Sequence, residues 1–132
     1  MPHPMTVAIQ ADLQKLADSA KAEPMQAYMK TKQPFYGVTA GPRRKSFKVV
    51  ARQFKAISRA DYEQIITELW AGPYREEMYQ ALELIDHYQA YRDQQSWPLY
   101  ERLVRSAPHW DTLDWLAGGP ISELVRRQRT FE

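Results

Sequence analysis

The sequence of 132 residues contains no cysteine, which excludes disulfide bonds, a thiol nucleophile and any zinc or iron–sulfur site with cysteine ligands. It also has no run of 18 apolar residues long enough to cross a membrane. The first residues, Met-Pro-His-Pro, lack the basic and then apolar order of a signal peptide. We therefore expect a cytoplasmic protein that makes no contact with a membrane.

Motifs that commonly mark a metal or nucleotide site are missing as well. There is no glycine-rich phosphate loop, no HExxH pair and no calcium-binding loop. The three histidines, His3, His87 and His109, are far apart in the sequence, and no nucleophile elbow marks a serine hydrolase. The sequence thus predicts no metal site and no cofactor.

Helical periodicity runs through almost the whole chain. Apolar residues at 44% and charged residues at 26% are typical of a globular domain. Apolar positions three and four apart, bounded by Pro, Gly and Ser, predict amphipathic helices. The expected helices cover residues 7–19, 22–30, 42–57, 59–70, 78 to beyond 91, 98–105, 108–116 and 121–129. The longest expected loop runs from Thr31 to Pro42 and contains two glycines and two prolines, one of which is Pro42 itself.

The expected fold class is all-α, because no segment alternates apolar and polar residues between hairpin turns. Helices joined by short turns form either a bundle or a stack of antiparallel pairs, as in HEAT repeats. Periodicity alone does not choose between these two architectures. Both place residues 1–132 in a single helical domain.

Charge is distributed unevenly along the chain. The net charge is only +2, but the segment from Arg43 to Arg59 has seven basic residues and no acidic one. These residues are Arg43, Arg44, Lys45, Lys48, Arg52, Lys55 and Arg59. Salt-bridged surface helices usually interleave both signs, whereas a row of cations on one helix face can neutralise a row of phosphates. From the residues alone, a nucleic-acid-binding face and a merely solvated face both remain open.

A second pattern is the run His-Trp-Asp-Thr-Leu-Asp-Trp that begins at His109. Trp110 and Asp114 are four residues apart, which makes them neighbours on one face of a helix. An indole face attracts a cation, and a nearby carboxylate adds a Coulomb attraction. The pair suits a positively charged ligand, although a core tryptophan beside a surface aspartate explains the same spacing.

Several runs together resemble the AlkD-like DNA alkylation repair glycosylases. They are Glu23-Pro24-Met25-Gln26-Ala27-Tyr28-Met29-Lys30, Phe35-Tyr36-Gly37-Val38, Arg43-Arg44, Glu68-Leu69-Trp70, Pro73, Arg75-Glu76 and Trp110-Asp111-Thr112-Leu113-Asp114. The resemblance follows the chain in order over nearly its whole length. It implies antiparallel helix pairs stacked as a HEAT-like α-solenoid around duplex DNA that carries alkylated bases.

The resemblance also implies an activity, the hydrolytic release of cationic N-alkylated purines such as 3-methyladenine and 7-methylguanine. The family's catalytic aspartate falls on Asp114, its first active-site tryptophan on Trp110 and its tyrosine near the lesion on Tyr28. With the family's basic DNA-facing surface in mind, we assign nucleic-acid binding to Tyr28 and to the basic helix. The assigned basic residues are Arg43, Arg44, Lys48, Arg52 and Lys55. A non-catalytic module that binds duplex DNA and a protein-interaction scaffold are the alternatives.

The sequence departs from the family pattern in two places. Pro42 stands one position later than the proline of the family's usual Thr-Pro. The family's members are longer than this chain, so it is expected to represent the N-terminal half, without a further tryptophan and a catalytic arginine. A helical stack ending there exposes an apolar face, from which we expect self-association and reduced activity. The expected face consists of Leu113, Leu116, Ile121, Leu124 and Val125.

Overall fold

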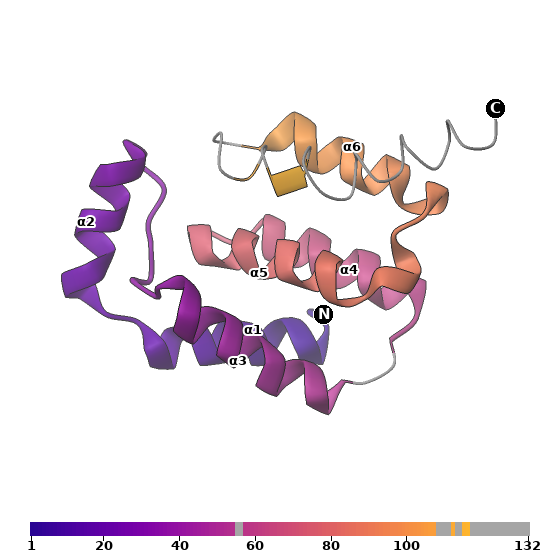
Figure 1. The fold of residues 1–132 in the computed structure, drawn as a ribbon, viewed down its shortest axis with the longest axis horizontal. Coiled ribbons are helices and arrows are strands. Elements are labelled where there is room, and N and C mark those ends of the chain that lie inside the picture. Colours follow the sequence, from indigo (N-terminus) through magenta and orange to yellow (C-terminus); the bar gives the residue numbers. More distant parts are fainter. Residues whose placement is uncertain (55–56, 108–111, 113–114, 117–132) are drawn as a thin grey trace. The chain divides into compact units, whose positions relative to one another are not determined.

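The computed structural model describes residues 1–54, 57–107, 112 and 115–116. All regular elements in these ranges are helical (Figure 1), which confirms the predicted all-α class. The helices are α1 (Pro4–Leu16), α2 (Ser19–Met29), α3 (Ala40–Gln53), α4 (Arg59–Trp70), α5 (Arg75–His87) and α6 (Trp97–Ser106). Two 3₁₀ turns, η1 (Gln89–Tyr91) and η2 (Gln94–Ser96), separate α5 from α6. No described helix is long and apolar enough to span a membrane.

Some helix ends follow local sequence signals and others do not. Ser58 stands just before the helix expected at 59–70 and caps α4, within a capping box that it forms with Asp61. The helix expected to run past Tyr91 instead ends at His87, because Tyr88 adopts a non-helical conformation with φ −95° and ψ 69°. Ser96 precedes α6, but its hydroxyl donates to the carbonyl of Tyr91 and makes no capping hydrogen bond to α6. The helices predicted at 108–116 and 121–129 fall almost wholly outside the described residues.

The chain divides into two compact units, residues 1–83 and 84–132, with the boundary inside α5. The first unit has a continuous apolar core in which α1 packs against α3 and α4. Its fully buried side chains include Met5, Ile9, Leu13, Tyr62, Ile65, Ile66, Leu69 and Ala81. The second unit buries Leu84, Ile85, Leu99, Tyr100, Leu103 and Leu116. Since one helix belongs to both units, the expectation of a single domain over 1–132 stays a prediction.

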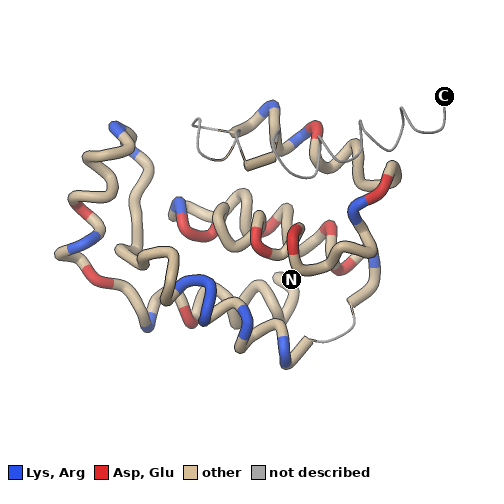
Figure 2. The backbone as a smooth tube through the Cα atoms, in the orientation of Figure 1, with Lys and Arg blue, Asp and Glu red and all other residues tan. Residues whose placement is uncertain are grey.

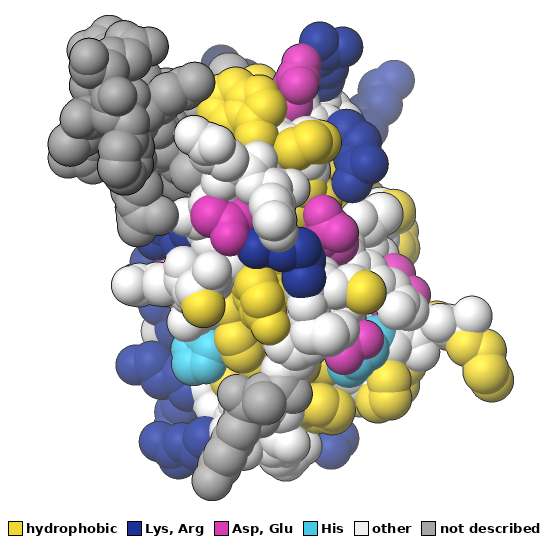
Figure 3. All heavy atoms as spheres, turned by 90° about the vertical axis from the view of Figure 1, so that its right-hand side faces the viewer, with side chains coloured by type: hydrophobic (Ala, Val, Ile, Leu, Met, Phe, Trp, Pro, Cys, Tyr) yellow, Lys and Arg dark blue, Asp and Glu magenta, His cyan; other side chains and the backbone are white. Residues whose placement is uncertain are grey.

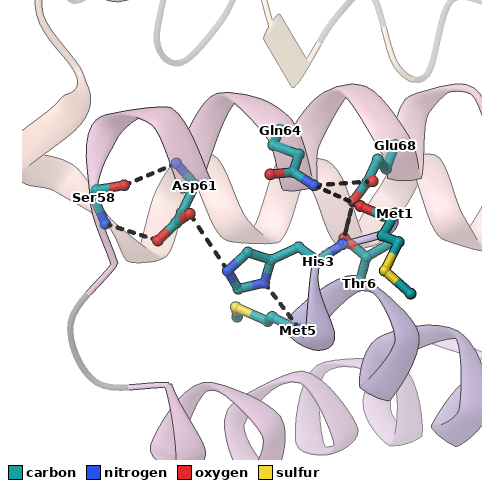
Figure 4. Close-up of polar contacts among 8 residues, drawn as sticks. All are labelled: Met1, His3, Met5, Thr6, Ser58, Asp61, Gln64 and Glu68. Atoms are coloured by element: carbon teal, nitrogen blue, oxygen red, sulfur yellow. Dashed lines mark hydrogen bonds and ion pairs between the residues drawn. The ribbon is translucent and has the colours of Figure 1, made fainter.

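Polar groups fix the start of α1 against α4 (Figure 4). The carboxylate of Glu68 accepts hydrogen bonds from the backbone N–H of His3 at 3.0 Å and from the hydroxyl of Thr6 at 2.7 Å. The His3 ring accepts from the Met5 amide through Nδ1, and its Nε2 lies 3.6 Å from a carboxylate oxygen of Asp61. These contacts satisfy helix-end amides that otherwise lack partners. They hold α1 beneath the helix that follows the basic segment.

Candidate nucleic-acid interface

The exposed face of α3 carries a row of cations. Arg44, Lys48 and Arg52 follow one another at intervals of four, and all three side chains are exposed. Buried positions of α3 lie on the opposite side and include Phe47, Val50 and Ala51. Figure 2 shows blue segments along α3 with no red between them, and in Figure 3 Lys and Arg side chains gather along the lower-left edge. The predicted basic face therefore exists over the described part of this segment, whereas Lys55 lies outside the described residues.

Arg43 belongs to the inside of α3 and not to the exposed row. Its side chain is only 4% exposed, and Nη1 donates to Gln80 at 3.0 Å and to Glu83 at 3.3 Å. The guanidinium also lies 5.4 Å from the centre of the Tyr79 ring. Burial lowers the pKa of Arg43, an effect that the nearby Glu83 carboxylate opposes. This placement argues against the predicted contact between Arg43 and DNA, because its donors already bind α5.

Arg44 contacts the same oxygen of Glu83 as Arg43 does, but from the solvent side. Its Nε lies 3.1 Å from Oε1 of Glu83, and the Arg44 side chain is 58% exposed. One glutamate therefore pairs with two arginines, and the cluster keeps a net positive charge. An exposed ion pair of this kind contributes less than about 1 kcal/mol to stability. Arg44 thus remains available to a stronger anionic partner such as a phosphate.

An aromatic hollow lies beside the start of α3, within the same unit. Its volume is about 290 Å³, and its lining residues are Pro24, Met25, Tyr28, Met29, Phe35 and Tyr79. Tyr28 is 77% exposed, so its ring is available to a ligand. Because the Tyr79 ring also contacts Arg43, the structure brings this hollow next to the first turn of the basic helix.

Sequence reasoning missed the polar contacts that hold the loop between α2 and α3. The backbone amides of Tyr36, Gly37 and Val38 all donate to the carboxylate of Glu76, at 2.9, 2.9 and 3.0 Å. Gly37 has a φ of +91°, and a Cβ there would lie 2.0 Å from the backbone oxygen of Asp18, so only glycine fits. We call Glu76 and the three backbone amides that it binds the Glu76 clamp.

The neighbours of Glu76 hold the same loop from either side. Arg75 is fully buried, and its amide donates to the Pro34 carbonyl at 3.0 Å while its Nε donates to the Gln33 side chain. Glu77 accepts from the Tyr36 hydroxyl at 2.8 Å. Burial raises the pKa of the Glu77 carboxyl, and the hydrogen bond from Tyr36 opposes that rise. The sequence does carry a signal for these buried polar contacts, because three charged residues, Arg75, Glu76 and Glu77, stand together at the start of α5.

In the second unit, the predicted catalytic pair of Trp110 and Asp114 lies outside the described residues. Three residues around it are described, and all three are helical. Thr112 and Leu116 are fully buried, while the indole N–H of Trp115 donates to Asp86 at 3.1 Å.

The expected exposed apolar face is wrong at the one member that the structure describes. Leu116 is 0% exposed, because it lies one helical turn from Thr112 on a face that packs inward. The other members, Leu113, Ile121, Leu124 and Val125, lie outside the described residues. Among the described residues, no three His, Asp or Glu side chains form a group that could hold a metal ion.

The fold and the basic row together define an all-helical protein with one strongly cationic helix face. The sequence model of the DNA alkylation repair enzyme family matches residues 9–132. The chain therefore belongs to the DNA alkylation repair enzyme family, and this membership supports a general role in DNA alkylation repair. No curated protein matches the sequence.

Proposed function

We propose that this protein binds duplex DNA that carries alkylated bases and hydrolytically releases cationic N-alkylated purines, such as 3-methyladenine and 7-methylguanine. The observation that carries the proposal is the row Arg44, Lys48 and Arg52 on α3, next to the hollow that contains the exposed Tyr28. Family membership supplies the connection to alkylation repair. The basic row supplies a surface that suits the substrate.

The spacing of the row suits a nucleic-acid backbone. Residues four apart on a helix are separated by about 6 Å along its axis, and duplex DNA carries one negative charge per roughly 1.7 Å of its length. Each of the three cations is thus within reach of a phosphate. Arg43 takes a different role in this proposal, since it fixes the start of α3 on α5 through Gln80 and Glu83. Lys55 stays a proposed contact from its place in the sequence.

The proposed chemistry uses the charge of the lesion itself. An N-alkylated purine is already cationic and leaves as a neutral base, so it needs no general acid. The deoxyribose becomes oxocarbenium-like as the glycosidic bond stretches. We assign Asp114 to the electrostatic stabilisation of that cation and to orienting the attacking water, and we assign Trp110 to a cation–π contact. Tyr28 is proposed to contact the DNA near the lesion.

The decisive experiment measures base release from duplex DNA containing 7-methylguanine. The wild-type chain is expected to release the base, and Asp114→Asn, which removes the charge and keeps the shape, is expected to lower the rate at least 100-fold. Asp93→Asn in the same unit is a matched control and should retain activity. Release that is equally fast in Asp114→Asn would refute the assigned catalytic role.

Binding is tested separately with unreactive duplex DNA at several salt concentrations. Reversal of the row in Lys48→Glu plus Arg52→Glu should weaken binding and lower the magnitude of the salt slope by about two. Lys15→Glu plus Lys21→Glu changes the net charge equally at exposed positions on α1 and α2 and is the matched control. Salt-dependent binding through the row without base release would favour a non-catalytic DNA-binding module. If the chain shows neither DNA binding nor base release, the alternative of a protein-interaction scaffold is favoured.

Self-association through the remaining members of the expected apolar face is also testable; buried Leu116 no longer belongs to that face. Light scattering over a range of protein concentrations would show a rising average mass if copies associate. A constant monomer mass would contradict the proposal.

A further inference from the structure

We propose that Glu83 competes with DNA phosphate for Arg44 and thereby limits the affinity of the basic row for DNA. The inference rests on the proposed function, because it takes the row on α3 as the DNA contact, and it adds a residue that regulates this contact. Glu83 lies on α5, outside every run on which the family resemblance was based. Glu83, Arg43 and Arg44 all belong to the first unit, so their contacts are internal to one compact part of the chain.

One oxygen of the Glu83 carboxylate contacts an arginine on either side. Oε1 lies 3.3 Å from Nη1 of Arg43 and 3.1 Å from Nε of Arg44. The Arg43 side chain is buried and the Glu83 side chain is 17% exposed, whereas more than half of the Arg44 side chain is exposed. A ligand that approaches from solvent therefore reaches the outer ion pair, between Glu83 and Arg44, and leaves the inner pair intact.

The inner pair does not depend on Arg44. Fully buried Gln80 accepts from Nη1 of Arg43 at 3.0 Å and donates to the Arg43 carbonyl at 3.3 Å. When Arg44 turns to another anion, Glu83 keeps a charged partner in Arg43. A largely buried carboxylate left without a charged partner is strongly destabilising, and the inner arginine avoids that outcome. Arg44 can thus exchange Glu83 for a phosphate while the contact between α3 and α5 stays as it is.

The exchange opposes DNA binding. In the free protein, the negative charge of Glu83 attracts Arg44, and this attraction must be given up when Arg44 binds a phosphate. Because exposed ion pairs contribute little, we expect Glu83 to weaken DNA binding by about two- to fivefold. Among the described residues, Glu83 forms its ion pairs with Arg43 and Arg44 and not with Lys48. The competition should therefore be confined to one member of the row.

A double-mutant cycle tests the competition, with the dissociation constant of unreactive duplex DNA measured by fluorescence anisotropy at one salt concentration. Glu83→Gln removes the charge and keeps an oxygen for Arg43, and it should bind DNA about two- to fivefold more tightly than the wild type. In an Arg44→Ala background, the same change should alter the dissociation constant by less than about 1.5-fold, because no arginine is released. In a Lys48→Ala background, the full gain should persist.

Asp12→Asn is the matched control for net charge. Asp12 also contacts α3, where it accepts from the hydroxyl of Ser46 at 3.2 Å. An asparagine oxygen still accepts that bond, so this variant should bind DNA within about 1.5-fold of the wild type. Equal gains in Asp12→Asn and Glu83→Gln, or an equal gain from Glu83→Gln with and without Arg44, would overturn the proposal, because the effect would be a general loss of negative charge. Unchanged or weaker binding by Glu83→Gln would overturn it too.

NMR of arginine Nε–H groups follows the exchange of partners directly. The Arg44 signal should differ between wild type and Glu83→Gln in the free proteins, where its acceptor changes from a carboxylate to an amide. At saturating DNA the two signals should coincide, because a phosphate is the acceptor in both. A difference that persists in the complex would overturn the exchange. In the wild type alone, DNA should shift the Arg44 signal and leave that of Arg43 in place, a comparison that needs no variant of Glu83.

The outcomes also separate this proposal from the proposed function. Base release and DNA binding by the wild type without any effect of Glu83→Gln would overturn the role of Glu83 alone. The expected cycle in a chain that releases no base would refute the proposed hydrolysis and leave the role of Glu83 intact. A wild-type chain that does not bind duplex DNA would refute both.

Discussion

The Glu76 clamp provides the sharpest test of how this fold is held together. Glu76→Gln changes one carboxylate oxygen to an amide nitrogen and adds no bulk. The wild-type carboxylate accepts from three consecutive backbone amides, those of residues 36 to 38, and is itself 0% exposed. In the variant, the new NH₂ group is a donor that faces backbone donors.

The expected loss of stability follows from counting these bonds. A hydrogen bond to a charged acceptor contributes about 1.5–3 kcal/mol, and a neutral one about 1 kcal/mol. A glutamine oxygen in the place of Oε2 can still accept from the amides of Gly37 and Val38, which both donate to that oxygen. The three wild-type bonds therefore exceed the two that the variant keeps by roughly 2.5 kcal/mol or more. That is a large part of the 5–15 kcal/mol typical of a domain. Glu76→Gln should remain folded in water but unfold at a much lower denaturant concentration.

Urea unfolding followed by far-UV circular dichroism measures this loss, provided that the slope m is the same in both proteins. The matched control is Glu77→Gln, one residue along. That side chain binds a hydroxyl and an amide side chain, not the backbone, and a glutamine can both accept from Tyr36 and donate to Gln10. We expect Glu77→Gln to change stability by less than about 1 kcal/mol. A loss below about 1 kcal/mol in Glu76→Gln, or equal losses in the two variants, would refute the reasoning.

Three further outcomes are expected. Gly37→Ala places a Cβ 2.0 Å from a backbone oxygen at a φ of +91° and should lower the free energy of unfolding by more than about 2 kcal/mol. The added Cβ of Gly41→Ala meets no atom within 4 Å, so this control should leave the stability unchanged, and thermal melts of both variants test the difference. Ser58→Ala breaks the capping box with Asp61 and should cost about 1 kcal/mol, measured by urea unfolding; Ser106→Ala at a helix end is the comparison. Because the folded-state pKa of Glu77 is raised by burial, its contribution to stability is greatest below the ordinary carboxyl pKa and is lost as pH rises through the raised value. Urea midpoints across that interval should fall less steeply in Glu77→Gln than in the wild type, and parallel profiles would contradict the assignment.

The sequence predicted those features that depend on neighbours along the chain. The position of Ser58 just before α4 and the end of α4 at Trp70 follow from residues within one turn. The apolar face of α3 was also visible from spacing, and Phe47 and Val50 are buried on it. Arg43 is in register with those two residues, so its burial could have been predicted. What local spacing could not supply was its partner, because Glu83 is 40 residues away.

The candidate site was predictable to a similar extent. Periodicity indicated the exposed row of cations, and the row is present at Arg44, Lys48 and Arg52. The Glu76 clamp and the bond between Asp86 and Trp115 were not predictable, since they join residues 38 to 40 and 29 positions apart. A single sequence carries no signal for which distant polar groups meet. The resemblance to a family suggested roles for residues but not these supporting contacts.

The Glu76 clamp also orders events during synthesis. The loop amides at 36–38 leave the ribosome before the carboxylate that binds them has been made, so the connection between nascent α2 and α3 lacks this acceptor until α5 emerges. Contacts between distant residues form late because the intervening chain must first be closed into a loop. Hydrogen–deuterium pulse labelling during refolding should therefore find the amide of Gly37 protected only together with those of α5, as one cooperative event.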